Sequence, residues 1–286
     1  MKTSLSIFVL CAFSTVLFGQ KNTHGTIHDF DLTGSVKSLS YDEFTVASGD
    51  GFDDIIMSDD DIGNDHIRVD FDKAGNVVKH TSLKGGTATD IKVYEYNEKG
   101  QLVSKKEYGA SDDYLFTAEG EEQTDTLGGC FLGTHSTFKY DLKSNSTIET
   151  VYWSPEVLDH IITYSYNSEA QLVSYVSTNE KKEITEKITY SYDSNGNMTE
   201  VKTDNSIEMN QKLEYNNKNQ LSKKTTFYDD GKEAQTYNYS YDVNGRITQE
   251  GAYGYVYKDD DKGNWIGQIM SYDIPSMLIK RTIKYH

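Results

Sequence analysis

The sequence predicts an all-β protein whose tandem β-hairpins stack into one elongated, curled antiparallel sheet, either solenoid-like or partly closed. Three observations predict this fold. A short unit recurs along most of the chain, aromatic and β-branched residues alternate with polar ones before each unit, and turn-forming residues follow each aromatic anchor. Hydrophobic residues make up only 36 % of the 286 residues, and the chain contains 22 tyrosines. We therefore expect a core that is lean in aliphatic side chains and rich in aromatic rings.

The recurring unit reads aromatic, Asp or Asn, two variable residues, a Gly-like residue, a polar residue and a hydrophobic residue. A degraded copy starts at Tyr140 and a shifted copy ends at Trp265, and successive anchors from Tyr140 to Tyr241 lie 23 or 26 residues apart. Such repetition along one chain indicates a repeat architecture. The clear copies begin at Phe71, Tyr96, Tyr166, Tyr192, Tyr215 and Tyr241.

The residues before each anchor predict a strand with one apolar face. Tyr190 and Tyr192 point to one side of such a strand, and Ser191 points to the other. A single hairpin of this kind cannot bury its apolar face alone. Stacking the hairpins side by side solves this, with tyrosines that pair across neighbouring strands.

The residues after each anchor predict a tight turn. Asp193 can accept a hydrogen bond from the backbone two residues on, and Gly196 tolerates the positive φ that closes a short hairpin. Asn219 can take the same left-handed conformation, whereas Ala170 adopts it less readily. Each unit is therefore expected to form one hairpin.

These units resemble YD repeats, also called RHS repeats, over roughly residues 66 to 285. The closing stretches 262–266 and 281–285 and the opening stretch 31–39 are similar to those of small secreted members of this group. The resemblance implies a continuous, curling sheet on the bacterial cell surface or in the periplasm. The chain is too short for the closed shell of the large relatives, and it has neither their toxin domain nor their self-cleavage signature. Their delivery role is therefore not carried over.

The N-terminus predicts export. Lys2, the apolar run of residues 5–18 and Gly19 form an expected signal peptide over residues 1–19. An N-terminal strand and an acidic loop follow over residues 20–65, and the repeats occupy 66–286, with an irregular insertion at 110–135. No later stretch reaches the roughly 18 apolar residues of a helical span. We therefore expect a secreted, periplasmic or cell-surface protein that does not insert into a membrane once its signal peptide is removed.

Charge and cysteine content restrict the possible partners. The net charge of −17 disfavours nucleic acid and anionic lipid, because phosphate contacts need a basic face. Neutral glycans, surface proteins and divalent cations remain open, and so does the oligomeric state. Since Cys11 lies in the signal peptide, Cys130 has no partner for an intrachain disulfide and no multi-cysteine zinc site can form. No cofactor is expected.

Two acidic clusters are weak calcium candidates. They lack the Glu that would complete an EF-hand loop at its twelfth position, and hairpin-turn chemistry explains their residues as well. The clusters are Asp59, Asp60 and Asp61, and Asp259, Asp260 and Asp261.

No pattern of a catalytic residue set occurs in the chain, and the tyrosine rows are the main candidates for ligand contact. An aromatic ring can stack on a sugar or hold a peptide, although the rings would also serve to pack hairpins together. Trp265 falls at a hydrophobic position of the repeat and is expected in the core. Trp153 lies outside that register and is a weak candidate ligand-binding residue.

Three classes of function follow from these observations. The favoured class is a non-catalytic binding module of the bacterial envelope, extracellular or periplasmic, that recognises a glycan or a protein. The second is a structural or adhesive envelope protein without a small ligand, which would show uniform faces and open sheet edges. The third is a carboxylate-based glycosidase, which would need a cleft with a carboxylate pair of perturbed pKa. We expect no enzymatic activity.

Overall fold

The computed structural model describes residues 27–49, 51–57, 65–110, 126–153, 157–204 and 209–286. These residues form one 3-10 helix, η1 (Ile27–Phe30), and twenty strands. The expected signal peptide and the acidic cluster at Asp59, Asp60 and Asp61 lie outside the described residues. The strands are β1 (Val36–Ser48), β2 (Ile56–Met57), β3 (Asp65–Phe71), β4 (Val77–Lys84), β5 (Thr87–Tyr96), β6 (Leu102–Gly109), β7 (Thr126–Leu127), β8 (Cys130–Asp141), β9 (Ser146–Trp153), β10 (Val157–Tyr166), β11 (Leu172–Asn179), β12 (Ile184–Tyr192), β13 (Met198–Asp204), β14 (Asn210–Tyr215), β15 (Leu221–Phe227), β16 (Glu233–Tyr241), β17 (Ile247–Glu250), β18 (Tyr253–Asp259), β19 (Trp265–Tyr272) and β20 (Ile274–Tyr285).

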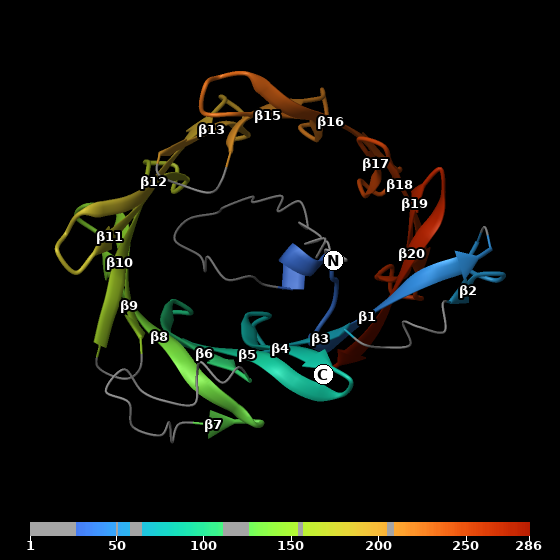
Figure 1. Ribbon diagram of the computed structural model, residues 1–286, viewed down its shortest axis with the longest axis horizontal. Coiled ribbons are helices and arrows are strands. Elements are labelled where there is room, and N and C mark those ends of the chain that lie inside the picture. The colour runs from blue at the N-terminus through green and yellow to red at the C-terminus, as the bar shows by residue number, and fades with distance from the viewer. Residues whose placement is uncertain (1–26, 50, 58–64, 111–125, 154–156, 205–208) are drawn as a thin grey trace, which may run out of the picture.

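The strands form a closed antiparallel ring (Figure 1). Each strand pairs with the next along the chain, except that β2 and β7 are short additions beside β1 and β8. β1 pairs with β3 on one side and with β20 on the other, from Val36 opposite Tyr285 to Thr45 opposite Met277. The sheet therefore closes into an 18-strand barrel. The predicted all-β antiparallel sheet is confirmed, but its elongated, solenoid-like or partly closed form is wrong, because the first and last strands pair and leave no edge between them.

Closure also corrects the prediction about membranes. That prediction considered helical spans alone. No helix among the described residues is long and apolar enough to cross a membrane. A closed ring of strands pairs the backbone groups of each strand with its neighbours, which is one requirement for strands to cross a bilayer. The 18-strand barrel therefore contradicts the prediction of no membrane insertion.

The two faces of the barrel wall differ in chemistry. Helix η1 lies inside the ring (Figure 1), and Phe30 at its end contacts the rings of Tyr41 and Phe71, which therefore point inward. Directly paired residues of neighbouring strands share a face, so the register extends this assignment around the ring. The inner wall carries Tyr94, Tyr96, Tyr140, Tyr164, Tyr166, Tyr175, Tyr190, Tyr192, Tyr215, Tyr237, Tyr239, Tyr241, Tyr255 and Tyr257.

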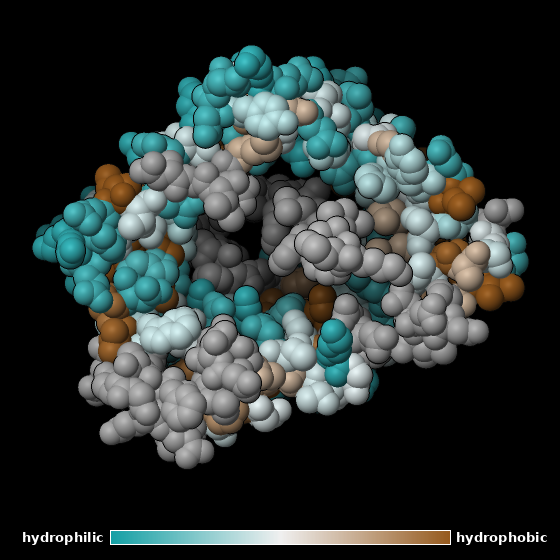
Figure 2. Space-filling model, viewed as in Figure 1, coloured by the Kyte–Doolittle hydropathy of each residue, from teal (hydrophilic) through white to brown (hydrophobic). Residues whose placement is uncertain are grey.

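The outer wall of β12 to β14 is polar. Its paired positions carry Lys187, Thr189, Ser191, Glu200, Lys202, Asp204, Lys212 and Glu214. Figure 2 shows the neighbouring outer surface, over β13 to β16, as mostly hydrophilic. Two apolar parts of the outer wall are covered by the chain itself. The β7–β8 hairpin folds over a buried cluster, and the ring of Phe52 lies over Gly267. The buried cluster consists of Ile91, Tyr108, Cys130 and Leu132.

The repeat turns have the expected geometry. Asp193 Oδ1 accepts hydrogen bonds from the backbone N–H of Asn195 and of Asn197, both at 2.9 Å. The fifth position has a positive φ in all six clear copies of the unit, and this includes Ala170 at 61° and Asn219 at 59°. Because alternate turns of an antiparallel ring lie at the same end, all these turns gather at one rim of the barrel, called here the repeat rim.

Candidate functional site

The anchor tyrosines connect neighbouring repeats through one recurring hydrogen bond. All of them except Tyr166 donate the hydroxyl to the backbone carbonyl of the hydrophobic residue that ends the preceding unit. Tyr192 donates to Leu172 at 2.7 Å and Tyr241 to Leu221 at 2.8 Å. The rings at the repeat rim thus hold hairpin to hairpin. The other bonds of this kind are Tyr96 to Val77, Tyr140 to Leu102, Tyr215 to Met198 and Tyr257 to Ile247.

A network of charges is built into the inner wall across β5, β6 and β9. Lys105 lies 3.1 Å from Glu107 and 3.2 Å from Glu149, and Lys92 lies 3.6 Å from Glu107. Tyr164 donates to Glu149 at 2.7 Å. Glu149 is only 1 % exposed, so its charge depends on these partners. Sequence reasoning missed this network, although the alternation of the strands already placed its residues on the face of the tyrosines.

A second acidic side chain is held by tyrosines on the opposite part of the wall. Tyr239 donates to Glu250 at 2.8 Å, and the Tyr255 hydroxyl lies 3.5 Å from the other carboxylate oxygen. The ammonium of Lys224 lies 3.9 Å from Glu250 and 4.8 Å from the centre of the Tyr237 ring. Carboxylates on this wall are therefore tied to tyrosine hydroxyls and to cations.

A hollow lies between two hairpins at the repeat rim. It has a volume of about 400 Å³ and is bordered by the β10–β11 turn and by β12 with its turn. The rings of Tyr190 and Tyr192 and the side chain of Val173 form its apolar part, and amides and carboxylates form the remainder. The polar lining residues are Asn167, Glu169, Gln171, Asp193 and Ser194.

The polar lining is held in place by the turns. Asn167 accepts backbone hydrogen bonds from Glu169 and Gln171 at 3.1 and 2.8 Å, and the Gln171 amide reaches the carbonyl of Gly196 in the next repeat at 3.2 Å. Hydrogen bonds from the side chain and backbone of Asn197 lower the pKa of Asp193, which keeps this carboxylate ionised. The hollow therefore offers an aromatic surface beside fixed hydrogen-bonding groups.

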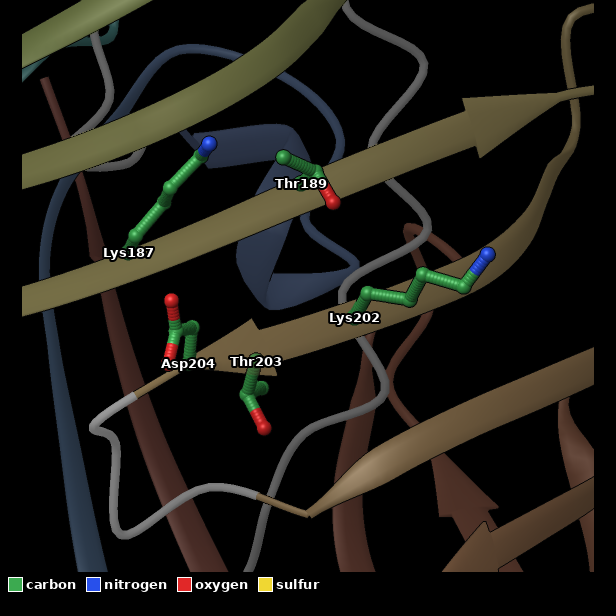
Figure 3. Close-up of a pocket in the computed structure, with 5 residues that line it drawn as sticks. All are labelled: Lys187, Thr189, Lys202, Thr203 and Asp204. Carbon is green, nitrogen blue, oxygen red and sulfur yellow. The ribbon is translucent and has the colours of Figure 1, made fainter. Parts of the chain in front are cut away.

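A smaller hollow of about 160 Å³ lies at β12 and β13 (Figure 3). Lys187 and Thr189 come from β12, and Lys202, Thr203 and Asp204 come from β13. It contains no aromatic ring, and Lys202 is already paired with Glu200 at 3.0 Å. This hollow offers less to a ligand than the one at the repeat rim.

The two tryptophans lie in different places. Trp153 is 38 % exposed at the end of β9, opposite Thr134 and Val157, at the rim away from the repeat turns. It does not line the hollow of Tyr190. Trp265 lies on the inner wall, packed against the guanidinium of Arg281 at 3.8 Å and against the rings of Tyr41 and Tyr257.

The second calcium candidate is largely occupied by turn contacts. Asp260 Oδ1 accepts from the backbone of Lys262 and Asn264, both at 2.9 Å, and Asp259 pairs with Arg246. Asp261 is exposed. The described part of the chain holds no group of three or more His, Cys, Asp or Glu residues arranged for a metal ion.

Comparison with known proteins gives little further information. No family model and no curated protein matches the chain. Among solved structures, a porin-like protein from Bacteroides uniformis ATCC 8492 is 12 % identical, with a TM-score of 0.37, and the match covers 87 % of this chain and 96 % of that chain. A protein of unknown function from Bacteroides fragilis NCTC 9343 is 12 % identical over 56 % of this chain and 88 % of that chain, with a TM-score of 0.21. A porin-like protein from Bacteroides vulgatus ATCC 8482 is 9 % identical over 88 % of this chain and 99 % of that chain, with a TM-score of 0.25.

Similarities this low carry no argument about function.

Proposed function

We propose that this chain is a non-catalytic barrel of the bacterial envelope, of the YD-repeat kind, that binds a neutral oligosaccharide on its inner wall. The observation that carries the proposal is the hollow of about 400 Å³ at the repeat rim, where Tyr190 and Tyr192 face a ring of amides and carboxylates. Its location in the envelope follows from the expected signal peptide.

The lining chemistry suits a neutral sugar. The face of a tyrosine ring covers the apolar face of a pyranose, and amide and carboxylate groups bond its hydroxyls. Asn167 and Gln171 supply amides, and Glu169 and Asp193 supply carboxylates. Two carboxylates disfavour an acidic sugar, because like charges repel.

The distribution of side chains favours a ligand inside the barrel. Channel-forming barrels carry an apolar band outside and a polar, water-filled interior. Here the tyrosines line the interior, and charged side chains occupy the outer wall of β12 to β14. Aromatic rings on the inside are the surface expected of a binding site and not of a water-filled channel.

The other two classes of function have less support. A structural protein that self-associates through open edges needs free strand edges, and here β1 pairs with β20. A glycosidase needs a carboxylate pair that is free to act. Glu107 and Glu149 both contact Lys105, and Glu149 also accepts from Tyr164.

The test is a glycan-array screen of the chain from residue 20 onward, followed by titration calorimetry of any hit. We expect a neutral oligosaccharide to bind, and Tyr190→Ala to weaken binding roughly tenfold, which is about the value of one aromatic contact. Trp153→Ala, at the opposite rim, is the control and should leave the affinity unchanged. Loss of binding in Trp153→Ala alone would move the site away from the hollow. No binding at any concentration, with a folded barrel, would refute the proposal.

A further inference from the structure

The segment that precedes β1 lies inside the barrel, against the inner wall (Figure 1). The ring of Phe30 meets the ring of Phe71 edge-on at 5.6 Å and that of Tyr41 at 6.4 Å. Leu32 is only 1 % exposed and packs in the main buried cluster with Leu39 and other wall residues. Two side chains of this segment, spaced two residues apart, thus occupy apolar positions of the wall.

The wall also holds the backbone of the segment. Arg281 donates from Nη2 to the carbonyl of Phe30 at 2.6 Å. The amide of Asn264 accepts from the N–H of Thr33 at 2.7 Å and donates to the carbonyl of Thr33 at 3.2 Å. The N–H of His286 donates to the carbonyl of Ser35 at 2.9 Å. Backbone hydrogen bonds beside side-chain pockets are a general means of holding a peptide segment, and here the segment is a 3-10 turn followed by Asp31 with a φ of 51°.

The acidic residue between the two apolar ones has its own partners. The guanidinium of Arg281, stacked on Trp265 at 3.8 Å, attracts the carboxylate of Asp31, and the Trp265 side chain also favours the charged form of this group. Burial raises the pKa of Asp31, and these two groups partly offset that cost. The wall therefore matches an aromatic, an acidic and an aliphatic residue in consecutive positions.

One residue of the repeat departs from its usual role here. At the sixth position of another unit, Asn197 turns its amide back to Asp193 of its own turn, at 2.9 Å. Asn264 occupies the same position, but its amide is turned to Thr33 and to the hydroxyl of Tyr285 at 2.6 Å. The side chain is fully buried in this arrangement. The last repeat is thus specialised to hold the segment.

We infer that the inner wall beside Trp265 and Arg281 is a peptide-binding site, selective for an aromatic–acidic–aliphatic tripeptide, and that Phe30-Asp31-Leu32 is its resident occupant. A peptide with this pattern, supplied separately, competes for the site. The tether keeps the resident segment at a high effective concentration, so the intact chain does not bind the free peptide. The link through Thr33, Gly34 and Ser35 is exposed and can be cut.

The experiment uses the full chain with a specific protease site inserted between Gly34 and Ser35. After cleavage, a fluorescent peptide with the sequence of residues 27–34 is added, and exchange is followed by anisotropy and mass spectrometry. We expect the cut barrel to retain its segment, to release it to excess labelled peptide and to take up one label per chain. A peptide with Asp31→Asn should bind roughly tenfold more weakly, because it loses the attraction between this carboxylate and the guanidinium of Arg281. The uncut chain should take up no label.

Other outcomes would overturn the inference. If the cut barrel never exchanges its segment, the segment is a fixed part of the core and the wall beside it is not a binding site. A barrel that loses the segment but, still folded by circular dichroism, does not bind the labelled peptide has no such site. Equal binding of a scrambled peptide removes the selectivity, and unfolding after the cut shows that the segment belongs to the folding core.

Discussion

Asn264 offers a sharp test of how the barrel holds its N-terminal segment. Its amide makes four hydrogen bonds beyond its own turn. It accepts from the N–H and the hydroxyl of Thr33 at 2.7 and 3.3 Å, and it donates to the carbonyl of Thr33 at 3.2 Å and to the Tyr285 hydroxyl at 2.6 Å. Asn264 is fully buried, so its removal leaves a gap in the wall and takes these partners from the backbone groups of Thr33. Each hydrogen bond contributes about 1 kcal/mol net, and the one from the Thr33 hydroxyl is long, so we expect Asn264→Ala to lower the free energy of unfolding by about 3–4 kcal/mol.

The chain supplies a matched control for this substitution. Asn197 stands at the same position of its repeat, but its amide reaches only Asp193 at 2.9 Å and Asn219 at 3.3 Å, in a turn at the rim. Asn197→Ala should therefore lower the free energy of unfolding by less than about 1 kcal/mol. Urea unfolding of both variants, followed by tryptophan fluorescence, gives the comparison. If the two variants lose the same free energy of unfolding, the reasoning about the segment is refuted.

Three further predictions concern the repeats. Tyr241→Phe removes the hydrogen bond from the hydroxyl to the carbonyl of Leu221 but keeps the ring. It should lower the free energy of unfolding, measured by urea titration, by about 1 kcal/mol. No change would show that the ring alone connects the repeats. Ala170→Gly should raise the unfolding midpoint, because Ala170 has a φ of 61° that glycine adopts without strain; a lower midpoint would contradict this. The pKa of Asp193 is lowered in the fold from its ordinary value of 3.8, so its stabilisation is present above pH 4 or so and is lost as the pH falls through the lowered value. Several other repeats have an asparagine at this position. The variant Asp193→Asn should therefore lose less free energy of unfolding than the original chain between pH 5 and about pH 3, as measured by urea titrations. An unchanged pH profile would contradict the role of the carboxylate.

The repeat turns could be predicted from the sequence because they depend on neighbours only. An Asp or Asn side chain reaches the backbone two and four residues on, and the fifth position needs a positive φ, so Asp193 and Asn219 behave as local chemistry requires. The alternation of Tyr190, Ser191 and Tyr192 likewise determines which residues share a face. These features depend only on residues that lie within a few positions of one another in the sequence.

The candidate site could be predicted only in part. The tyrosine rows were visible as a class, but Trp153 was the weak candidate, and it lies at the opposite rim from the hollow lined by Tyr190. The hollow is formed by two hairpins about 25 residues apart, where the Gln171 amide meets the carbonyl of Gly196. No local pattern shows which of several equivalent repeats leaves such a space.

By itself, the sequence determined the hairpin unit, its turns and the separation of tyrosines from polar residues along each strand. Only the tertiary structure decided that β1 meets β20, that the tyrosines face inward and that Asn264 holds Thr33. The physical reason is distance along the chain. Closure depends on small twists summed over many strands and on pairing residues such as Val36 and Tyr285, which are neighbours only after the whole ring has formed.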